Sequence, residues 1–135
     1  MSEQTLYDAV GGMPFFERLV DAFYEGVATD QVLRPLYPAG DLSASRRHLT
    51  LFLAQYWGGP TTYNDERGHP KLRLRHMPFH VGPAERDHWL LHMGAAVEQV
   101  TEPGDVRDAL MNYFVPAADH LRNDTGLPIT APPQR

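Results

Sequence analysis

The sequence of 135 residues contains no cysteine. This absence excludes disulfide bonds, zinc sites built on cysteine, iron–sulfur clusters and cofactors attached through thioether bonds. Any metal ion in this protein must therefore be held by histidine, aspartate or glutamate, or must arrive inside a cofactor.

Long apolar runs and an excess of positive charge are also missing. No stretch approaches the roughly 20 apolar residues that a membrane-spanning helix requires, so we expect no membrane segment. The formal net charge is -5, from 12 basic and 17 acidic side chains, which argues against general nucleic-acid binding. The N-terminal segment MSEQTLYDAV lacks the basic and apolar regions of a secretion signal. These features together predict a cytoplasmic protein.

Hydrophobic residues make up 42% of the chain, with six Phe, six Tyr and two Trp among them, enough for the core of one domain. Their spacing is that of amphipathic helices, and no segment alternates in the manner of a strand. We therefore predict an all-α domain at residues 1–123 and a flexible tail at residues 124–135. The predicted helices cover about 6–10, 14–27, 30–33, 43–57, 71–77, 83–100 and a last segment from 105 onward.

Proline and glycine set most of the predicted helix ends. The expected inner face of the helix near 43–57 consists of Leu49, Phe52, Leu53 and Tyr56. Residues 61–69 are polar and contain glycine, which predicts a loop. Pro116 is expected to interrupt and kink the last helix.

Three features are unusual for a simple helix bundle. Glycine pairs stand at Gly11-Gly12 and Gly58-Gly59, and Pro70 and Pro78 bracket a segment with room for two helical turns. Such a short helix is unstable in isolation, so another part of the molecule must hold it in place. These features indicate a core that surrounds something other than side chains.

Among seven histidines, His76 stands apart because it lies at the end of the proline-bracketed segment. It follows Leu72 and Leu74 and precedes Met77 and Phe79. An imidazole in apolar surroundings suits an axial ligand of a planar apolar cofactor. Spacing alone leaves open the alternative that this residue is a turn histidine bonded to the backbone.

A second metal hypothesis uses carboxylates. Glu66/His69 and Glu85/His88 both match the Glu-x-x-His spacing of di-iron helical bundles. The first pair runs through Gly68 into a proline, where a helical turn is disfavoured, and suitable partner glutamates on other helices are lacking. His88 and His92, one helical turn apart, also suit a surface metal ion.

Five motifs carry a resemblance to a known family. They are YDAVGG at 7–12, FYEGVATDQVLRPLYP at 23–38, LFLAQYWGGPTTY at 51–63, RGHPKLRLRHMPF at 67–79 and ERDHWLLHM at 85–93. In this order and spacing they resemble the group II truncated haemoglobins. The resemblance implies the truncated globin fold, a two-over-two helical sandwich around haem b, and gives the glycine pairs and the bracketed segment a common reason.

The resemblance also implies roles for individual residues. His76, in RLRH, would be the proximal iron ligand. Tyr24, Tyr37 and Trp89 would stabilise a bound diatomic ligand by donating hydrogen bonds across the distal pocket. The remaining lining of that pocket would be Phe23, Ser45, Leu49 and Phe52, with Ser45 at the position where ordinary globins carry the distal histidine.

Contacts to the haem itself are implied near the same motifs. Arg75 is the first candidate for the haem propionates and Arg73 the second. His48 stands where relatives commonly carry arginine, and Tyr63 is a weaker candidate for the same edge. Leu72 is expected to contact the cofactor from the proximal segment.

The function implied is reversible binding of O2, and of NO, CO or other small ligands, at iron ligated by His76. Several donors around the ligand would make O2 release slow, which suits redox, NO or peroxide chemistry or sensing rather than bulk transport. The sequence leaves open whether the protein is a binder or an enzyme, such as an NO dioxygenase or a peroxidase-like protein. It also leaves open a reductase partner and assembly into a homo-oligomer.

Overall fold

The computed structural model describes residues 4–68 and 81–121. These residues form helices and turns, with no strand among them, which confirms the all-α prediction. The elements are α1 (Leu6–Ala9), α2 (Met13–Ala28), the 3₁₀ helix η1 (Arg34–Leu36), α3 (Ser43–Tyr56), α4 (Thr62–Arg67), α6 (Pro83–Val100) and α7 (Asp105–His120). Among residues 4–68 and 81–121, none of the helices combines the length and the hydropathy of a membrane-spanning segment.

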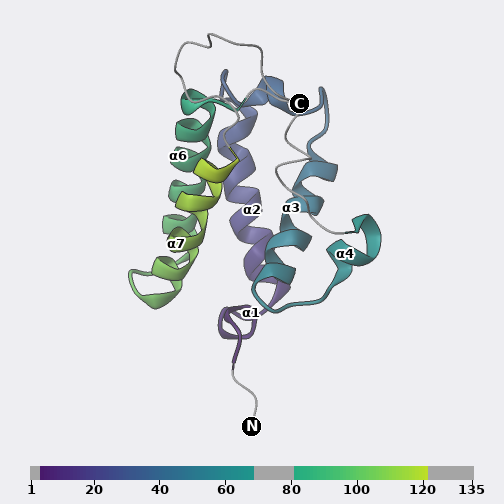
Figure 1. The fold of residues 1–135 in the computed structure, drawn as a ribbon, viewed down its shortest axis with the longest axis vertical. Coiled ribbons are helices and arrows are strands. Elements are labelled where there is room, and N and C mark those ends of the chain that lie inside the picture. Colours follow the sequence, from purple (N-terminus) through teal and green to yellow (C-terminus); the bar gives the residue numbers. More distant parts are fainter. Residues whose placement is uncertain (1–3, 69–80, 122–135) are drawn as a thin grey trace.

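The long helices form two antiparallel pairs (Figure 1). One pair is α2 with α3, the other is α6 with α7, and α2 also packs directly on α6. This is the two-over-two arrangement that the motifs predict. The largest fully buried side chains are aromatic or long aliphatic, led by Phe16, Phe23, Phe114, Leu19, Leu33, Leu53 and Met93.

The N-terminal helix α1 is docked against the end of α3 through the second glycine pair. The backbone N–H of Tyr7 donates to the carbonyl of Trp57 over 3.0 Å. A Cβ atom at Gly59 would lie 2.6 Å from two ring atoms of Tyr7 and 2.8 Å from the Ala54 carbonyl oxygen. Only glycine permits this approach, so the glycine pair closes one end of the α2–α3 layer.

Three sequence predictions about local structure are wrong. The predicted helix at 30–33 is a turn, and the 3₁₀ helix η1 begins after it, at Arg34. The segment expected to be a loop at 61–69 contains the helix α4, whose residue Tyr63 is buried with 4% of its surface exposed. The expected interruption of the last helix at Pro116 is absent, because α7 runs on to His120. Pro116 lies on an exposed face of α7, so water can reach the carbonyl that has lost its helical donor.

The expected inner face of α3 is correct only in part. Leu53 is buried, but Tyr56 is 53% exposed, while Leu51 and Ala54 are buried. The reason is that α3 has neighbours on more than one side. It packs on α2 along one face and borders a cavity along another, so its buried residues do not form one stripe.

Candidate functional site

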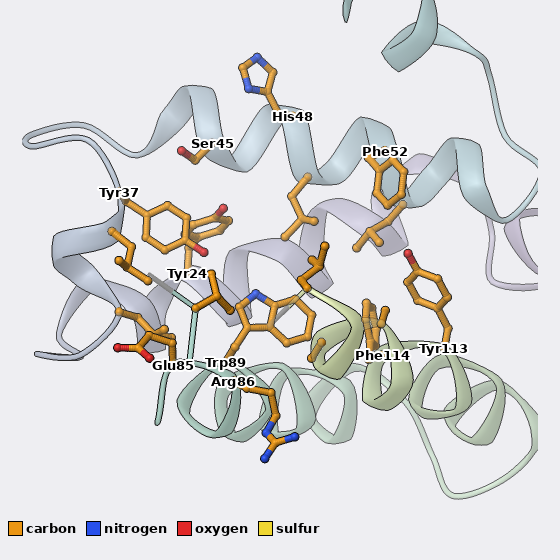
Figure 2. Close-up of a pocket in the computed structure, with 18 of the residues that line it drawn as sticks. Tyr24, Tyr37, Ser45, His48, Phe52, Glu85, Arg86, Trp89, Tyr113 and Phe114 are labelled. Carbon is orange, nitrogen blue, oxygen red and sulfur yellow. The ribbon is translucent and has the colours of Figure 1, made fainter. Parts of the chain in front are cut away.

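A cavity of about 370 Å³ lies between α3 on one side and α6 and α7 on the other (Figure 2). Most of its exposed wall is apolar or aromatic, and the charged residues in its lining include Arg67, Glu85 and Arg86. Its size and lining are those of a small-molecule or cofactor site. The turn that follows η1 closes one end of the cavity.

Two tyrosines meet at that end. Tyr24, from α2, is 3% exposed, and Tyr37, which ends η1, is half-buried with its ring 5.5 Å from that of Tyr24. Burial and the neighbouring Tyr37 phenol raise the pKa of Tyr24 far above its ordinary value. Burial also raises the pKa of Tyr37 to about 12. Both phenols therefore keep their protons at neutral pH and can donate hydrogen bonds.

Trp89 reaches the cavity from α6. Figure 2 shows its indole between the two tyrosines and Tyr113, with the ring nitrogen on the side that faces α3. Its ring is held by Phe23 at 5.3 Å and Phe114 at 5.7 Å, measured between ring centroids. Phe23, predicted to line the pocket, is fully buried behind Trp89 and Tyr24 and is not part of the lining.

The α3 wall of the cavity follows helical spacing. Ser45, Leu49 and Phe52 lie about one turn apart and all line the cavity, as does His48. Phe52 also packs on the buried Tyr63 of α4, with ring centroids 5.5 Å apart. Leu49 and Phe52 give this wall apolar surface, and the Ser45 hydroxyl is a hydrogen-bond partner of Tyr24.

One cation in the cavity lining was not predicted from the sequence. Arg67, at the end of α4, lines the cavity, and its Nη1 lies 3.0 Å from Nε2 of His48. Its guanidinium also lies 5.9 Å from the centroid of the Tyr63 ring. Arg67 stands inside the RGHPKLRLRHMPF motif, but predicting a loop there concealed its place beside α3. The proximal candidates of the sequence analysis, His76, Leu72, Arg73 and Arg75, lie outside the described residues.

The carboxylates of the di-iron hypothesis have other roles. Glu66 pairs with Arg47 at the surface of α3 and α4. Glu85 caps α6 by accepting from the backbone N–H of Gly82 over 2.8 Å. Across residues 4–68 and 81–121, no group of histidine and acidic side chains is arranged to hold a metal ion. His69 lies outside the described residues.

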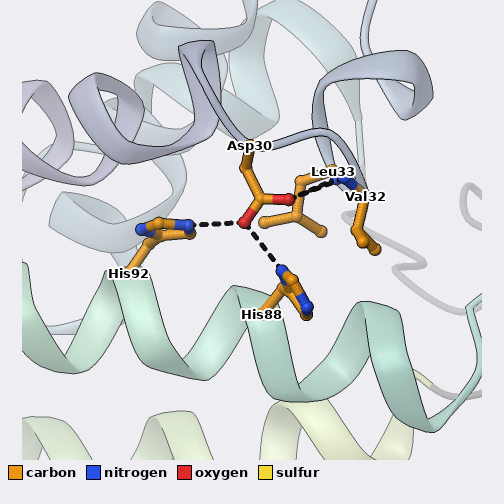
Figure 3. Close-up of polar contacts among 5 residues, drawn as sticks. All are labelled: Asp30, Val32, Leu33, His88 and His92. Carbon is orange, nitrogen blue, oxygen red and sulfur yellow. Dashed lines mark hydrogen bonds and ion pairs between the residues drawn. The ribbon is translucent and has the colours of Figure 1, made fainter.

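His88 and His92 bind a carboxylate (Figure 3). His88 Nδ1 lies 2.8 Å and His92 Nε2 2.6 Å from Oδ2 of Asp30, in the turn after α2. The side chain of Asp30 is 6% exposed. Asp30 also caps the turn that follows it, because its Oδ1 accepts from the backbone N–H groups of Val32 and Leu33.

Comparison with known proteins yields one consistent family. The family model described as bacterial-like globin matches residues 5–123. Group 2 truncated hemoglobin YjbI of Bacillus subtilis is 40% identical over 119 residues, which are 88% of this chain and 89% of the relative.

Solved structures agree with that match. A thermostable hemoglobin from Thermobifida fusca superposes with a TM-score of 0.86 at 52% identity, covering 89% of this chain and 98% of that one. The truncated oxygen-avid haemoglobin from Bacillus subtilis gives a TM-score of 0.83 at 39% identity, covering 89% and 100%. The resemblance seen in the five motifs is confirmed.

Proposed function

Because this chain belongs to the bacterial-like globin family, whose cofactor is haem, we propose that its cavity holds haem b with His76 as the ligand of the iron. We further propose that O2 bound at this haem dissociates slowly. The observation that carries the proposal is the arrangement of Tyr24, Tyr37 and Trp89. These three donors come from three separate elements and line one largely apolar cavity. A di-iron centre is not part of the proposal.

The residues present fit haem. The cavity between α3 and the α6–α7 pair has apolar side chains in its lining, among them Leu49, Phe52 and Phe114, which suit an apolar ring. Carboxylates at the edge of that ring require cations, and the Arg67 guanidinium, with its Nη1 3.0 Å from His48 Nε2, brings a positive charge to the cavity lining. We assign the propionate contacts to this pair and to Arg75 and Arg73, with Leu72 and Tyr63 as further contacts.

Haem supplies an iron atom that binds a diatomic ligand and shifts negative charge onto it. The protein contributes hydrogen-bond donors whose bodies are apolar, so that they exclude water while they donate. A hydrogen bond that involves a charged partner contributes roughly 1.5–3 kcal/mol. Because about 1.4 kcal/mol corresponds to a factor of ten, two such donors would slow release by about a hundredfold or more.

Slow release of O2 favours some functions of the site over others. A carrier must give up O2 readily, whereas redox, NO or peroxide chemistry and sensing benefit from a ligand that stays in place. We therefore propose one of these latter uses, with O2, NO or CO as ligands. NO dioxygenation would need a reductase partner, and a peroxidase-like reaction would need peroxide.

The test replaces the two tryptophans separately. Trp89→Phe keeps an aromatic body but removes the indole N–H, and we expect O2 dissociation, measured by stopped-flow absorbance, to become about tenfold faster or more. Trp57→Phe is the matched control, because Trp57 packs on Phe16 and Tyr113 and does not line the cavity. An equal rate in Trp89→Phe and the unmodified protein would remove Trp89 from the donors.

A further inference from the structure

The Asp30 carboxylate is the point at which the segments carrying all three donors meet. Asp30 follows α2, which carries Tyr24, and precedes η1, which ends at Tyr37. Its histidine partners on α6 stand on either side of Trp89 in the sequence. Figure 3 shows both imidazoles reaching from α6 to the same carboxylate.

The contact is built for close approach. A Cβ atom at Gly26 would lie 2.2 Å from Nδ1 of His92, so the absence of a side chain there lets the imidazole lie against α2. His92 is 21% and His88 40% exposed. They lie one helical turn apart, so both come from one face of α6. The two imidazoles therefore hold the helical turn of α6 from His88 to His92, which contains Trp89.

We propose that Asp30 is a positioning residue that sets the rate of ligand release by holding Trp89, through His88 and His92, in register with Tyr24 and Tyr37. The inference rests on the proposed function of the cavity. Hydrogen bonds to an ionised acceptor are stronger and more directional than neutral ones. Burying a carboxylate without hydrogen-bond partners costs much free energy. A shift of α6 that broke the hydrogen bonds from His88 and His92 to Asp30 would therefore be unfavourable.

The ionised state of Asp30 supports this role. Burial alone would raise its pKa, but the hydrogen bonds from His88, from the Leu33 backbone, from His92 and from the Val32 backbone outweigh burial and hold the pKa well below its ordinary value. The carboxylate therefore accepts all four bonds at neutral pH.

The competing explanation is that Asp30 only caps the turn that follows it. Asp30→Ser separates the two roles, because a serine oxygen can cap the turn but is too short to reach the histidines. Asp41→Ser is the matched control. At the start of α3, Asp41 Oδ1 accepts from the backbone N–H of Ser43 over 2.8 Å and from the Ser43 hydroxyl over 2.6 Å, and both of these bonds are local.

The experiment measures O2 dissociation from haem-loaded protein in two backgrounds. We expect Asp30→Ser to accelerate release about tenfold, and Asp41→Ser to leave the rate within about twofold of the unmodified protein. In a Trp89→Phe background, Asp30→Ser should add less than about twofold, because residues that act as one unit are not additive. The infrared stretch of bound CO should move in Asp30→Ser toward its position in Trp89→Phe.

Each outcome supports or overturns the proposal. An unchanged rate in Asp30→Ser, or the same acceleration in both backgrounds, overturns it. If Trp89→Phe has no effect in otherwise unmodified protein, Trp89 is not a donor, and the inference then fails at the premise taken from the proposed function rather than at Asp30. Should Asp30→Ser not retain haem, the half-exposed His88 gives a milder variant. His88→Ala should accelerate release and His88→Gln, whose amide can donate to Asp30, should restore it; no acceleration in His88→Ala also overturns the proposal.

Discussion

Gly26 offers a sharp test of the packing around Asp30. Replacing a helical glycine by alanine usually stabilises a helix by about 1 kcal/mol. At Gly26 the new Cβ would lie 2.2 Å from Nδ1, 2.7 Å from Cγ and 2.9 Å from Cε1 of His92. The imidazole must therefore leave Asp30, and the loss of a hydrogen bond to a charged acceptor costs roughly 1.5–3 kcal/mol. Gly26→Ala should lower the free energy of unfolding by about 0.5–2 kcal/mol, the difference of these two effects.

The chain supplies a control for this prediction. At Gly94 of α6 the nearest atom to a new Cβ would be Cε of Met111, at an ordinary contact distance of 3.8 Å. Gly94→Ala should therefore raise the free energy of unfolding by up to about 1 kcal/mol. The free energy of unfolding of both variants is measured by urea unfolding at the same haem concentration, because bound cofactor itself raises that free energy. Equal stabilisation by Gly26→Ala and Gly94→Ala would refute the reasoning. In a His92→Ala background the clashing ring is gone, so Gly26→Ala should become stabilising there.

Two further predictions concern charged groups. Because the folded-state pKa of Asp30 lies below its ordinary value of 3.8, its ionisation stabilises the fold above about pH 4 and this contribution is lost as pH falls below that value. The difference in unfolding free energy between the unmodified protein and Asp30→Asn should therefore begin to shrink as pH falls below about 5 and should continue to shrink toward the lowered folded-state pKa. Urea titrations at several pH values measure this difference, and a difference that stays constant below about pH 5 would contradict an ionised Asp30. Arg67→Leu should accelerate transfer of haem to an acceptor protein, because it removes the cation beside His48; transfer at the original rate would exclude Arg67 from cofactor binding.

Where proline and glycine coincide with an apolar stripe, the sequence predicts structure well. Pro83 opens a helix that ends at Val100, and the stripe after Pro14 becomes α2. These signals are local, because a missing N–H or a freely rotating backbone acts at its own position. The prediction failed for α4, whose sequence TYNDER has no apolar stripe. That helix depends on distant contacts, such as the hydrogen bond from the Asn64 backbone to Gln55 Oε1 at 3.0 Å.

The residues of the site likewise fall into those that local motifs predict and those whose place depends on distant contacts. Tyr24, Tyr37 and Trp89 were predicted from motifs, and the structure brings them to one cavity. The link from Asp30 to His88 spans 58 residues of sequence, so neither residue carries a local signal for the other. Arg67 was not predicted from the sequence, because its position beside His48 depends on how α4 packs against α3.

The account depends most on His76 as the ligand of the iron. The direct measurement is the absorption spectrum of purified His76→Gly protein with haem, recorded with and without added imidazole. We expect weak or altered haem binding that free imidazole restores to the spectrum of the unmodified protein, since imidazole replaces the missing ring. A variant whose spectrum and haem affinity match the unmodified protein without imidazole would contradict the account.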